Sequence, residues 1–224
     1  MRFLRISPYS LFIFIIVRFA VIAQNNIGCP NANFSMGNFS NWQGFTGNYQ
    51  NPASAMGIVA GRHTVITAQG IDPFSCGGLQ MIPPGSSFSA RLGNSASGAQ
   101  GEQLRYTLNV TPQNALFIYK YACVLEDPGH PPNAQPVFQM RLLDQNGTQI
   151  GGNCGQYTVY GGQPGQNFQT CGGVKWLPWT IVGVNLTAYT GQNVTIEFTT
   201  KDCDYSGHFG YAYVVADCMP LILD

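Results

Sequence analysis

The feature that most restricts the fold is a two-residue alternation of apolar and polar side chains in several segments. In residues 103–110 leucine, tyrosine and valine alternate with polar neighbours, and residues 194–199 and 211–215 show the same spacing. This period places one face of an extended strand on a core and the other face in solvent. Because no window of twelve or more residues has the spacing of an amphipathic helix, the alternation predicts an all-β chain.

Residues 114–125 differ from these segments because they are almost entirely apolar. Such a run is expected for a central strand that is covered on both faces. About a dozen strand candidates are separated by turn signals, which agrees with the 27 Gly and 14 Pro in the chain. We therefore predict an antiparallel β-sandwich of two sheets, formed by a single domain over residues 24–218.

Charge is scarce in this chain. Charged residues make up only 9% of it, against about 25% in an average soluble domain. Ten Lys and Arg balance ten Asp and Glu, so we expect no basic surface and no nucleic-acid partner. Coiled coils and helical repeats are excluded as well, because they need Glu, Lys and Arg in bulk.

Residues 1–23 have the pattern of a secretory signal peptide. Two arginines precede an apolar run at 11–17, and compact residues at 21–23 predict cleavage before Gln24. A transmembrane anchor is the alternative, but the run is too short to cross about 30 Å of hydrocarbon, and Arg18 interrupts it. We therefore expect a secreted or cell-surface protein with no stable membrane span after cleavage.

Cleavage of this segment also changes the charge balance. It removes three of the ten basic residues and none of the acidic ones, which leaves seven against ten and a formal net charge of −3. After the last cysteine, residues 219–223 are apolar, and the segment 219–224 is predicted to begin a linker or a truncated tail. We infer that the domain stands at the N-terminus of a longer protein or that the sequence is cut short.

The cysteine count also points to export. The chain has seven cysteines: Cys29, Cys76, Cys123, Cys154, Cys171, Cys203 and Cys218. Export makes disulfides the expected state, and an odd number leaves at least one thiol unpaired or paired between chains. Cys29 and Cys218 bracket the domain and are expected to join its first and last strands. Cys154 and Cys171 flank a loop rich in Gly, Gln and Tyr and are expected to close it.

Two further cysteines are each considered in a different chemical state. Cys123 lies in the apolar strand, where a buried free thiol is the ordinary state. Cys203 and His208 have the chemistry of a thiol–imidazole pair, but a disulfide is the stronger expectation for Cys203 in an exported chain. Metal binding by the cysteines is not expected, because the chain has no C-x-x-C pair.

Two loops combine carboxylates with a histidine, Glu-Asp-Pro-Gly-His at 126–130 and Asp-Cys-Asp-Tyr-Ser-Gly-His at 202–208. If they meet at one end of the sandwich, their side chains form a polar pocket for a ligand or a metal ion. The residues of this pocket would be Asp127, His130, Asp202, Asp204 and His208. The alternative is structural, with Asp side chains capping turns and histidines paired with carboxylates.

Aromatic side chains provide a second candidate surface. Trp176 and Trp179 flank a proline, and three more aromatic rings precede them in residues 156–170. Flat aromatic rings stack on sugars, and the amide side chains nearby can hydrogen-bond to sugar hydroxyls. The alternative is that at least one of the two tryptophans fills the end of the core.

Sequence signals for an enzyme are weak. The motifs G-x-S-x-G and H-E-x-x-H are absent. A glycosidase needs two carboxylates in one cleft, but Glu102, Glu126 and Glu197 fall on separate segments, and two of them are expected on exposed strand faces. We therefore expect no catalytic residues.

A family resemblance covers most of the chain. Residues 29–42 read Cys-Pro-Asn-Ala-Asn-Phe-Ser-Met-Gly-Asn-Phe-Ser-Asn-Trp, which resembles the opening of secreted jelly-roll sandwiches, including galactose-binding and carbohydrate-binding modules. Further pieces follow in order: Gly61-Arg-His-Thr64, Pro83-Pro-Gly85, Ser89-Ala-Arg-Leu-Gly-Asn94, Val124-Leu-Glu-Asp-Pro-Gly-His130, Trp176-Leu-Pro-Trp179 and the segment 202–213. Together they resemble the N-terminal β-sandwich of Bacteroidetes surface proteins, which often continue into PKD repeats and gliding-motility or type IX secretion regions.

This resemblance implies a jelly-roll fold and a non-catalytic recognition or adhesion module. Its partner would be an extracellular glycan or another cell-surface component. A purely structural domain that caps a larger surface protein is the alternative, and a secreted hydrolase is the least favoured function.

The resemblance also raises the question of calcium. Jelly rolls of this kind often hold a structural calcium ion between a Glu after the opening Phe and an Asp in the last strand. The corresponding residues here are Ser35 and Val215. Calcium needs several hard oxygen ligands, carboxylates among them. We therefore expect this site to be empty unless Asp217 substitutes, and we expect no cofactor.

Overall fold

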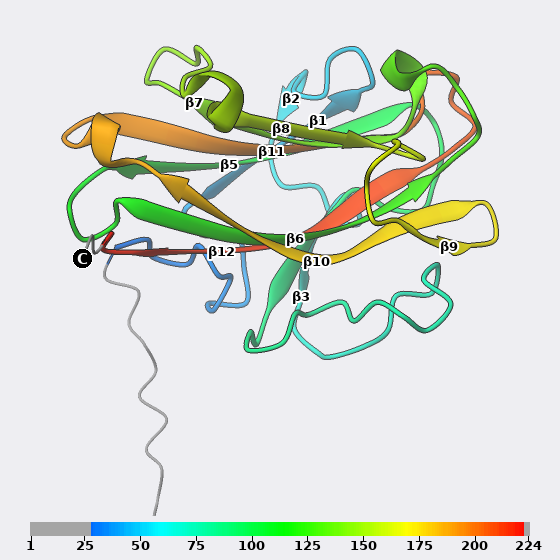
Figure 1. The fold of residues 1–224 in the computed structure, drawn as a ribbon, viewed down its shortest axis with the longest axis horizontal. Helices are drawn as coiled ribbons and strands as arrows, with labels where there is room; N and C mark the ends of the chain where they lie inside the picture. Colours follow the sequence, from blue (N-terminus) through cyan, green and yellow to red (C-terminus); the bar gives the residue numbers. More distant parts are fainter. Residues whose placement is uncertain (1–27, 222–224) are drawn as a thin grey trace, which may run out of the picture.

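The computed structural model describes residues 28–221, so the expected signal segment 1–23 and the last three residues lie outside the described part. Within that part the chain forms two six-stranded antiparallel sheets, which are the two layers of a sandwich (Figure 1). The first sheet has the strand order β2-β1-β5-β11-β7-β8, and the second has the order β3-β4-β12-β6-β10-β9. The predicted all-β sandwich is confirmed.

The strands and three short 3-10 helices have the following bounds. The first sheet contains β1 (Trp42–Asn48), β2 (Ala55–Met56), β5 (Gln100–Asn109), β7 (Val137–Leu143), β8 (Gln156–Tyr160) and β11 (Asn193–Lys201). The second contains β3 (His63–Ile66), β4 (Ser89–Leu92), β6 (Leu116–Glu126), β9 (Gln169–Cys171), β10 (Val174–Asn185) and β12 (Gly210–Met219). The helices are η1 (Pro132–Ala134), η2 (Gly152–Gly155) and η3 (Thr187–Tyr189). Residues 28–221 thus hold no helix long and apolar enough to cross a membrane.

The long strands change layer at each step along the chain. β5 of the first sheet is followed by β6 of the second, and β7, β10, β11 and β12 continue this alternation. This is the jelly-roll arrangement that the resemblance implied. Because Lys201 of β11 pairs with Val137 of β7, and Gly210 of β12 pairs with Leu125 of β6, the loops after β6 and β11 lie at the same end of the sandwich.

The core lies between the two sheets and follows the alternation of the sequence. Leu104 and Tyr106 of β5 are fully buried, whereas Arg105 and Thr107 face outward. Burial of apolar surface stabilises such a core by about 25 cal/mol per Å². The predicted half-buried strand is therefore present, with the predicted inward face.

β6 is covered on both faces, as its apolar sequence predicted. Tyr119 and Cys123 belong to the core between the sheets, while Val124 belongs to a second apolar cluster on the outer side of the second sheet. The long connection 67–88 between β3 and β4 covers that side and lies beneath the second sheet in Figure 1. Its Asp72 carboxylate accepts hydrogen bonds from two tyrosine hydroxyls of β12, which fixes the connection to the sheet.

The disulfides are only partly as expected. Cys29 is bonded to Cys218, which confirms the predicted link between the two ends of the domain. Cys171, however, is bonded to Cys76 and not to Cys154, which is an exposed free thiol. The prediction of a Cys154–Cys171 bridge is wrong, because the connection 67–88 folds back over the second sheet and brings Cys76 to β9.

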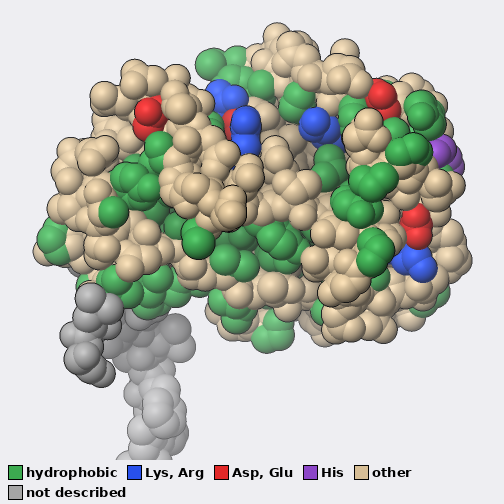
Figure 2. All heavy atoms as spheres, turned by 45° about the horizontal axis from the view of Figure 1, so that its top comes forward, with side chains coloured by type: hydrophobic (Ala, Val, Ile, Leu, Met, Phe, Trp, Pro, Cys, Tyr) green, Lys and Arg blue, Asp and Glu red, His purple; other side chains and the backbone are tan. Residues whose placement is uncertain are grey.

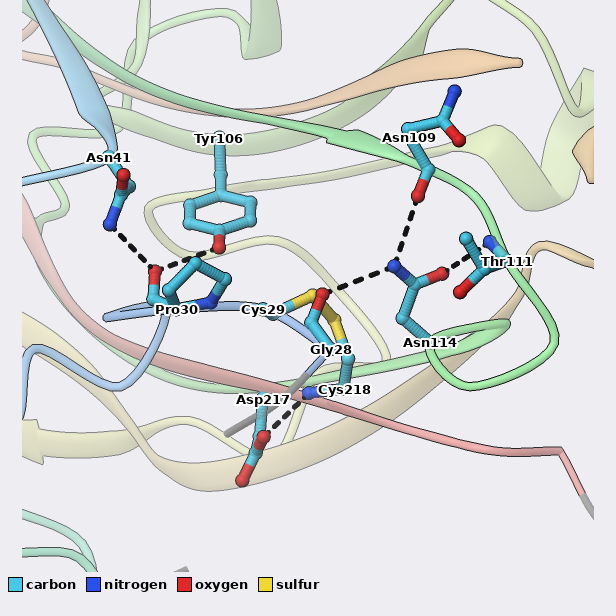
Figure 3. Close-up of a disulfide and its surroundings, with 10 residues drawn as sticks. All are labelled: Gly28, Cys29, Pro30, Asn41, Tyr106, Asn109, Thr111, Asn114, Asp217 and Cys218. Carbon is cyan, nitrogen blue, oxygen red and sulfur yellow. Dashed lines mark hydrogen bonds between the residues drawn. A yellow bond between two sulfur atoms is a disulfide. The ribbon is translucent and has the colours of Figure 1, made fainter. Parts of the chain in front are cut away.

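The surroundings of the terminal disulfide show how the start of the domain is attached (Figure 3). The Asn114 amide donates hydrogen bonds to the carbonyl oxygens of Gly28 and Asn109, at 3.1 and 3.0 Å. The hydroxyl of Tyr106 donates to the carbonyl oxygen of Pro30 at 2.9 Å. Side chains from the first sheet and from the turn before β6 therefore hold the segment that carries Cys29. Cys123, in contrast, is a buried free thiol, as predicted.

Candidate functional site

The loops after β6 and β11 meet, as the candidate pocket required. The ring centroids of His130 and His208 are 5.2 Å apart, and the ring of Tyr205 lies edge-on to His130 at 4.6 Å. The backbone N–H of Asp204 donates to the carbonyl oxygen of Ala134 at 3.1 Å, which holds the two loops together. Two of the five candidate residues, the histidines, are thus side by side.

The three carboxylates of the candidate pocket bond to other partners. Asp127 accepts a hydrogen bond from the Gln135 amide at 3.0 Å, and Asp204 accepts one from the Gln50 amide at 2.9 Å. Asp202 is 2% exposed and accepts hydrogen bonds only from backbone N–H groups in the described part of the chain. Burial, with a smaller contribution from the charge of Glu102, raises the pKa of Asp202 to about 7. The carboxylates therefore make structural hydrogen bonds, but within residues 28–221 Asp127 and Asp204 bond to amide side chains instead of capping turns, and neither His130 nor His208 pairs with a carboxylate.

The disulfide that the sequence favoured for Cys203 is not formed. Cys203 is a free thiol, and its Sγ lies 3.4 Å from Nδ1 of His208. Cys203, His208 and His130 each have one potential ligand atom within 4.8 Å of the others. The thiol–imidazole pair that the sequence allowed is therefore formed, with a second histidine beside it.

The two tryptophans lie under the connection 67–88. Trp176 is only 8% exposed and packs so closely on Gly78 that a Cβ there would lie 2.5 Å from the indole ring. Trp179 is half-buried and donates its Nε1–H to the carbonyl oxygen of Gln80 at 2.7 Å. Trp176 therefore has no open face for a sugar ring, and both tryptophans hold the connection against the second sheet.

The residues at the expected calcium position line a surface pocket of about 280 Å³. Ser35, Val215 and Asp217 all belong to its wall, together with Lys120. The Lys120 ammonium donates to the carbonyl oxygen of Pro84 at 3.1 Å, so a cation is already supplied by the chain at this place. One oxygen of Asp217 accepts the backbone N–H of Cys218. The expectation of an empty calcium site stays a prediction.

The sequence did not point to the outer face of the first sheet, which carries a group of charged side chains. Glu197 of β11 is directly opposite Arg105 of β5 and Arg141 of β7. Its carboxylate accepts hydrogen bonds from Nε of Arg105 at 2.7 Å and from Nε of Arg141 at 2.8 Å. Two of the three glutamates were expected on exposed strand faces, but Glu102 and Glu197 are only 1% and 0% exposed, and the two arginines cover Glu197.

A groove of about 320 Å³ lies beside this charged group. Its walls are Asn51, Pro52, Ala53, Gln103, Arg105, Gln139, Arg141, Thr199 and Lys201. The Thr199 hydroxyl is buried and has no hydrogen-bond partner within residues 28–221. Figure 2, with this face turned toward the viewer, shows blue basic side chains gathered among tan polar ones. The groove thus combines amides, a free hydroxyl and positive charge.

An aromatic ring beside the groove is already covered by Arg105. The guanidinium of Arg105 lies over the ring of Phe45, with its carbon 4.3 Å from the ring centroid. Such cation–π contacts contribute about 0.5–1 kcal/mol at exposed sites. The ring is therefore covered, and the groove is built to form hydrogen bonds and ion pairs instead of stacking contacts.

Comparisons with known proteins yield structural similarity only. No family model and no curated protein matches the sequence. Among solved structures, the chain is similar to TmCBM61 in complex with β-1,4-galactotriose, with a TM-score of 0.45 and 13% identity over 84% of this chain and 95% of that one. It is also similar to a non-crystalline cellulose specific module, CBM28, with a TM-score of 0.39 and 15% identity over 83% and 89% of the two chains. A third similarity is to tailspike protein 4 of bacteriophage CBA120, with a TM-score of 0.43 and 13% identity over 86% of this chain and 21% of that one.

Proposed function

We propose that this domain is a non-catalytic, extracellular recognition module that binds a glycan in the groove on the first sheet. The observation that carries the proposal is the buried Thr199 hydroxyl, which has no hydrogen-bond partner within residues 28–221 and belongs to the wall of a groove lined by amide and basic side chains. A buried polar group without a hydrogen bond costs about 1–3 kcal/mol. A sugar hydroxyl in the groove would supply the missing bond.

The chemistry of the groove fits a saccharide. Gln103 and Gln139 each offer a carbonyl oxygen and two N–H donors, so they can bond to hydroxyls in either direction. Gln103 of β5 and Gln139 of β7 are both directly opposite Thr199 of β11, so the three side chains lie on one face of the sheet. Recognition here relies on hydrogen bonds, since Arg105 covers the nearby ring of Phe45.

The charge of the groove favours a sugar with a carboxylate, such as a uronic acid. Arg105, Arg141 and Lys201 line it, and no acidic side chain among residues 28–221 does. Glu197 beneath neutralises one of the three positive charges. The three basic residues of the groove are thus three of only seven Lys and Arg outside the signal segment. Arginine forks bind carboxylates through paired hydrogen bonds of particular strength.

The proposed location is the cell exterior. The domain contains two disulfides. Such bonds persist in oxidising compartments and are rare in reducing ones. The signal segment, the adhesion role and the Bacteroidetes surface-protein context belong to the same proposal, and the resemblance of the sequence is what supports them.

A glycan array followed by titration calorimetry tests this function. We expect oligogalacturonate to bind and its neutral galactose counterpart of equal length to bind at least ten times more weakly. Lys201→Gln should weaken uronate binding about 10–100-fold, since a hydrogen bond to a charged group contributes about 1.5–3 kcal/mol. Lys175→Gln makes the same charge change on the second sheet, where Lys175 contacts Thr170, and should leave binding unchanged.

Three results would contradict the proposal in different ways. Equal weakening by both lysine variants would show that the groove is not the site, and equal binding of the charged and neutral oligosaccharides would show that its positive charge does not select the sugar. Uniform absence of binding on the array would favour the alternative, a structural domain that caps a larger surface protein.

A further inference from the structure

A cluster of three side chains that can bind a metal lies at the end of the sandwich and shares no residue with the groove walls. His130 belongs to the loop after β6, and Cys203 and His208 belong to the loop after β11. One potential ligand atom of each lies within 4.8 Å of the other two. The donor set is therefore two imidazoles and one thiol, contributed by two separate loops.

The loop after β11 is shaped so that its two ligands face the same way. The backbone N–H of Cys203 donates to the carbonyl oxygen of His208 at 2.9 Å, and the N–H of Ser206 donates to the carbonyl oxygen of Cys203 at 3.2 Å. Ser206 adopts a positive φ of 63°, which closes the turn. This turn sets Sγ of Cys203 3.4 Å from Nδ1 of His208.

One atom of the cluster lacks a partner. Nε2 of His130 is buried and has no hydrogen bond within residues 28–221. Buried polar atoms in folded proteins almost always have a partner. The missing partner of His130 is therefore an observation independent of the proximity of the three side chains.

We propose that His130, Cys203 and His208 bind a zinc ion through Nε2, Sγ and Nδ1, with a fourth position left for water. Zinc–sulfur and zinc–nitrogen bonds of about 2.3 and 2.0–2.1 Å in a tetrahedron place S and N about 3.6 Å apart, close to the 3.4 Å between Cys203 and His208. His130 needs a shift of roughly 1 Å to complete the same geometry, and it lies half-buried on a loop.

The donor atoms select the metal. Thiolate and imidazole suit zinc, whereas calcium and magnesium require oxygen ligands. Binding converts the Cys203 thiol into a thiolate and releases one proton, so affinity falls as the pH is lowered. The ion would also join the two loops, as a disulfide does elsewhere in this chain, and would keep Cys203 reduced.

Metal titration of the secreted chain tests the site. The background carries Cys154→Ser, because Cys154 is the one exposed free thiol in the described chain. We expect Co²⁺ to give the charge-transfer absorption of a cobalt–thiolate bond at one equivalent, and Zn²⁺ to displace it. His130→Ala and Cys203→Ser should each lower zinc affinity more than about 100-fold, because loss of even an outer partner of a ligand costs 10–100-fold.

Tyr205→Ala is the matched control, since Tyr205 is 62% exposed, contacts the His130 ring and provides no ligand to the cluster. It should retain the cobalt absorption and the zinc affinity. If Cys203→Ser does not fold, His130→Ala in its half-buried loop still decides the question. The proposal is overturned if the folded protein gives no cobalt–thiolate absorption, if His130→Ala binds zinc as tightly as its parent, or if peptide mapping finds Cys203 in a disulfide.

Discussion

The carboxylate of Asp202 joins the two sheets by accepting the N–H of Gln100 through one oxygen and the N–H of Gly210 through the other. The distances are 2.9 and 3.1 Å. Gln100 begins β5 in the first sheet, and Gly210 begins β12 in the second. A single buried side chain thus fixes the spacing of the layers at the end where the two loops meet.

The first prediction concerns the pH dependence that this arrangement creates. Burial raises the pKa of Asp202 to about 7, from about 3.9 in an unfolded chain. A carboxyl group with a raised pKa binds more protons in the folded state, so its contribution to stability is complete below about pH 4 and is lost as the pH rises through about 7. The free energy of unfolding, relative to Asp202→Asn, should therefore fall by more than about 1 kcal/mol between pH 4.5 and 7.5.

Urea unfolding of both proteins at several pH values measures this difference. Burial lowers the pKa of His63, which acts in the opposite direction, but His63 is present in both proteins and its effect cancels. A difference that stays constant, or that grows with pH, would show that Asp202 is ionised throughout.

The second prediction concerns the disulfide between Cys76 and Cys171. Replacing both cysteines by serine should lower the free energy of unfolding by about 2–4 kcal/mol, because the bridge restricts the unfolded chain. Tryptophan fluorescence should change in the folded state as well, since Trp176 and Trp179 lie under the connection that this bridge holds. Cys154→Ser is the control and should have little effect at its exposed position. Mapping of a Cys154–Cys171 peptide would contradict the assignment.

The third prediction tests the packing of Trp176 under the connection 67–88. A Cβ at Gly78 would lie 2.5 Å from the indole ring, so Gly78→Ala should destabilise the domain by about 1–3 kcal/mol. Gly173→Ala is a matched control, because a Cβ there has no neighbour within 4 Å. Urea unfolding followed by fluorescence compares the two. Equal stability would mean that the indole ring is not held against Gly78.

The fourth prediction concerns the buried carboxylate on the first sheet. Glu197→Gln removes the charge that pairs with Arg105 and Arg141, and we expect a loss of about 2–3 kcal/mol, somewhat below the 3–5 kcal/mol found for fully buried pairs. The reduction reflects the partial exposure of the two arginines. Gln139→Ala on the same face should cost less than about 0.5 kcal/mol. Thermal unfolding at low and high salt measures both, and a neutral result for Glu197→Gln would contradict a stabilising role.

The sequence allowed the main features of the fold to be predicted because they depend on local patterns. The alternation in residues 103–110 became β5 with the predicted inward face, and the apolar run 114–125 became a strand covered on both sides. The Cys29–Cys218 bridge was predictable too, since a jelly roll brings its first and last segments together.

Features that depend on the path of a long loop were not predictable. Cys76 reaches Cys171 only because residues 67–88 fold over the second sheet. The spacing of residues along the sequence does not reveal the path of this loop. The same fold-back buries Trp176, which the sequence left open as a binding surface.

The candidate sites show the same division. The sequence named His130 and His208 as neighbours only on the condition that their two loops meet, and the structure fulfils that condition. The bonds of Glu197 with two arginines required the register of three strands, which a single sequence does not provide. The free thiol of Cys203 was missed because export made a disulfide the general expectation.

The bond between Cys29 and Cys218 has a mechanical consequence. The two residues are 189 positions apart in the sequence, yet their Cα atoms are 5.6 Å apart. Tension applied to segments attached at the two ends would pass through this covalent bond and bypass every strand between them. The sandwich would therefore stay folded under pulling forces that separate the strands of an unbridged domain. Reduction of the Cys29–Cys218 bond would let the same force act on the strands.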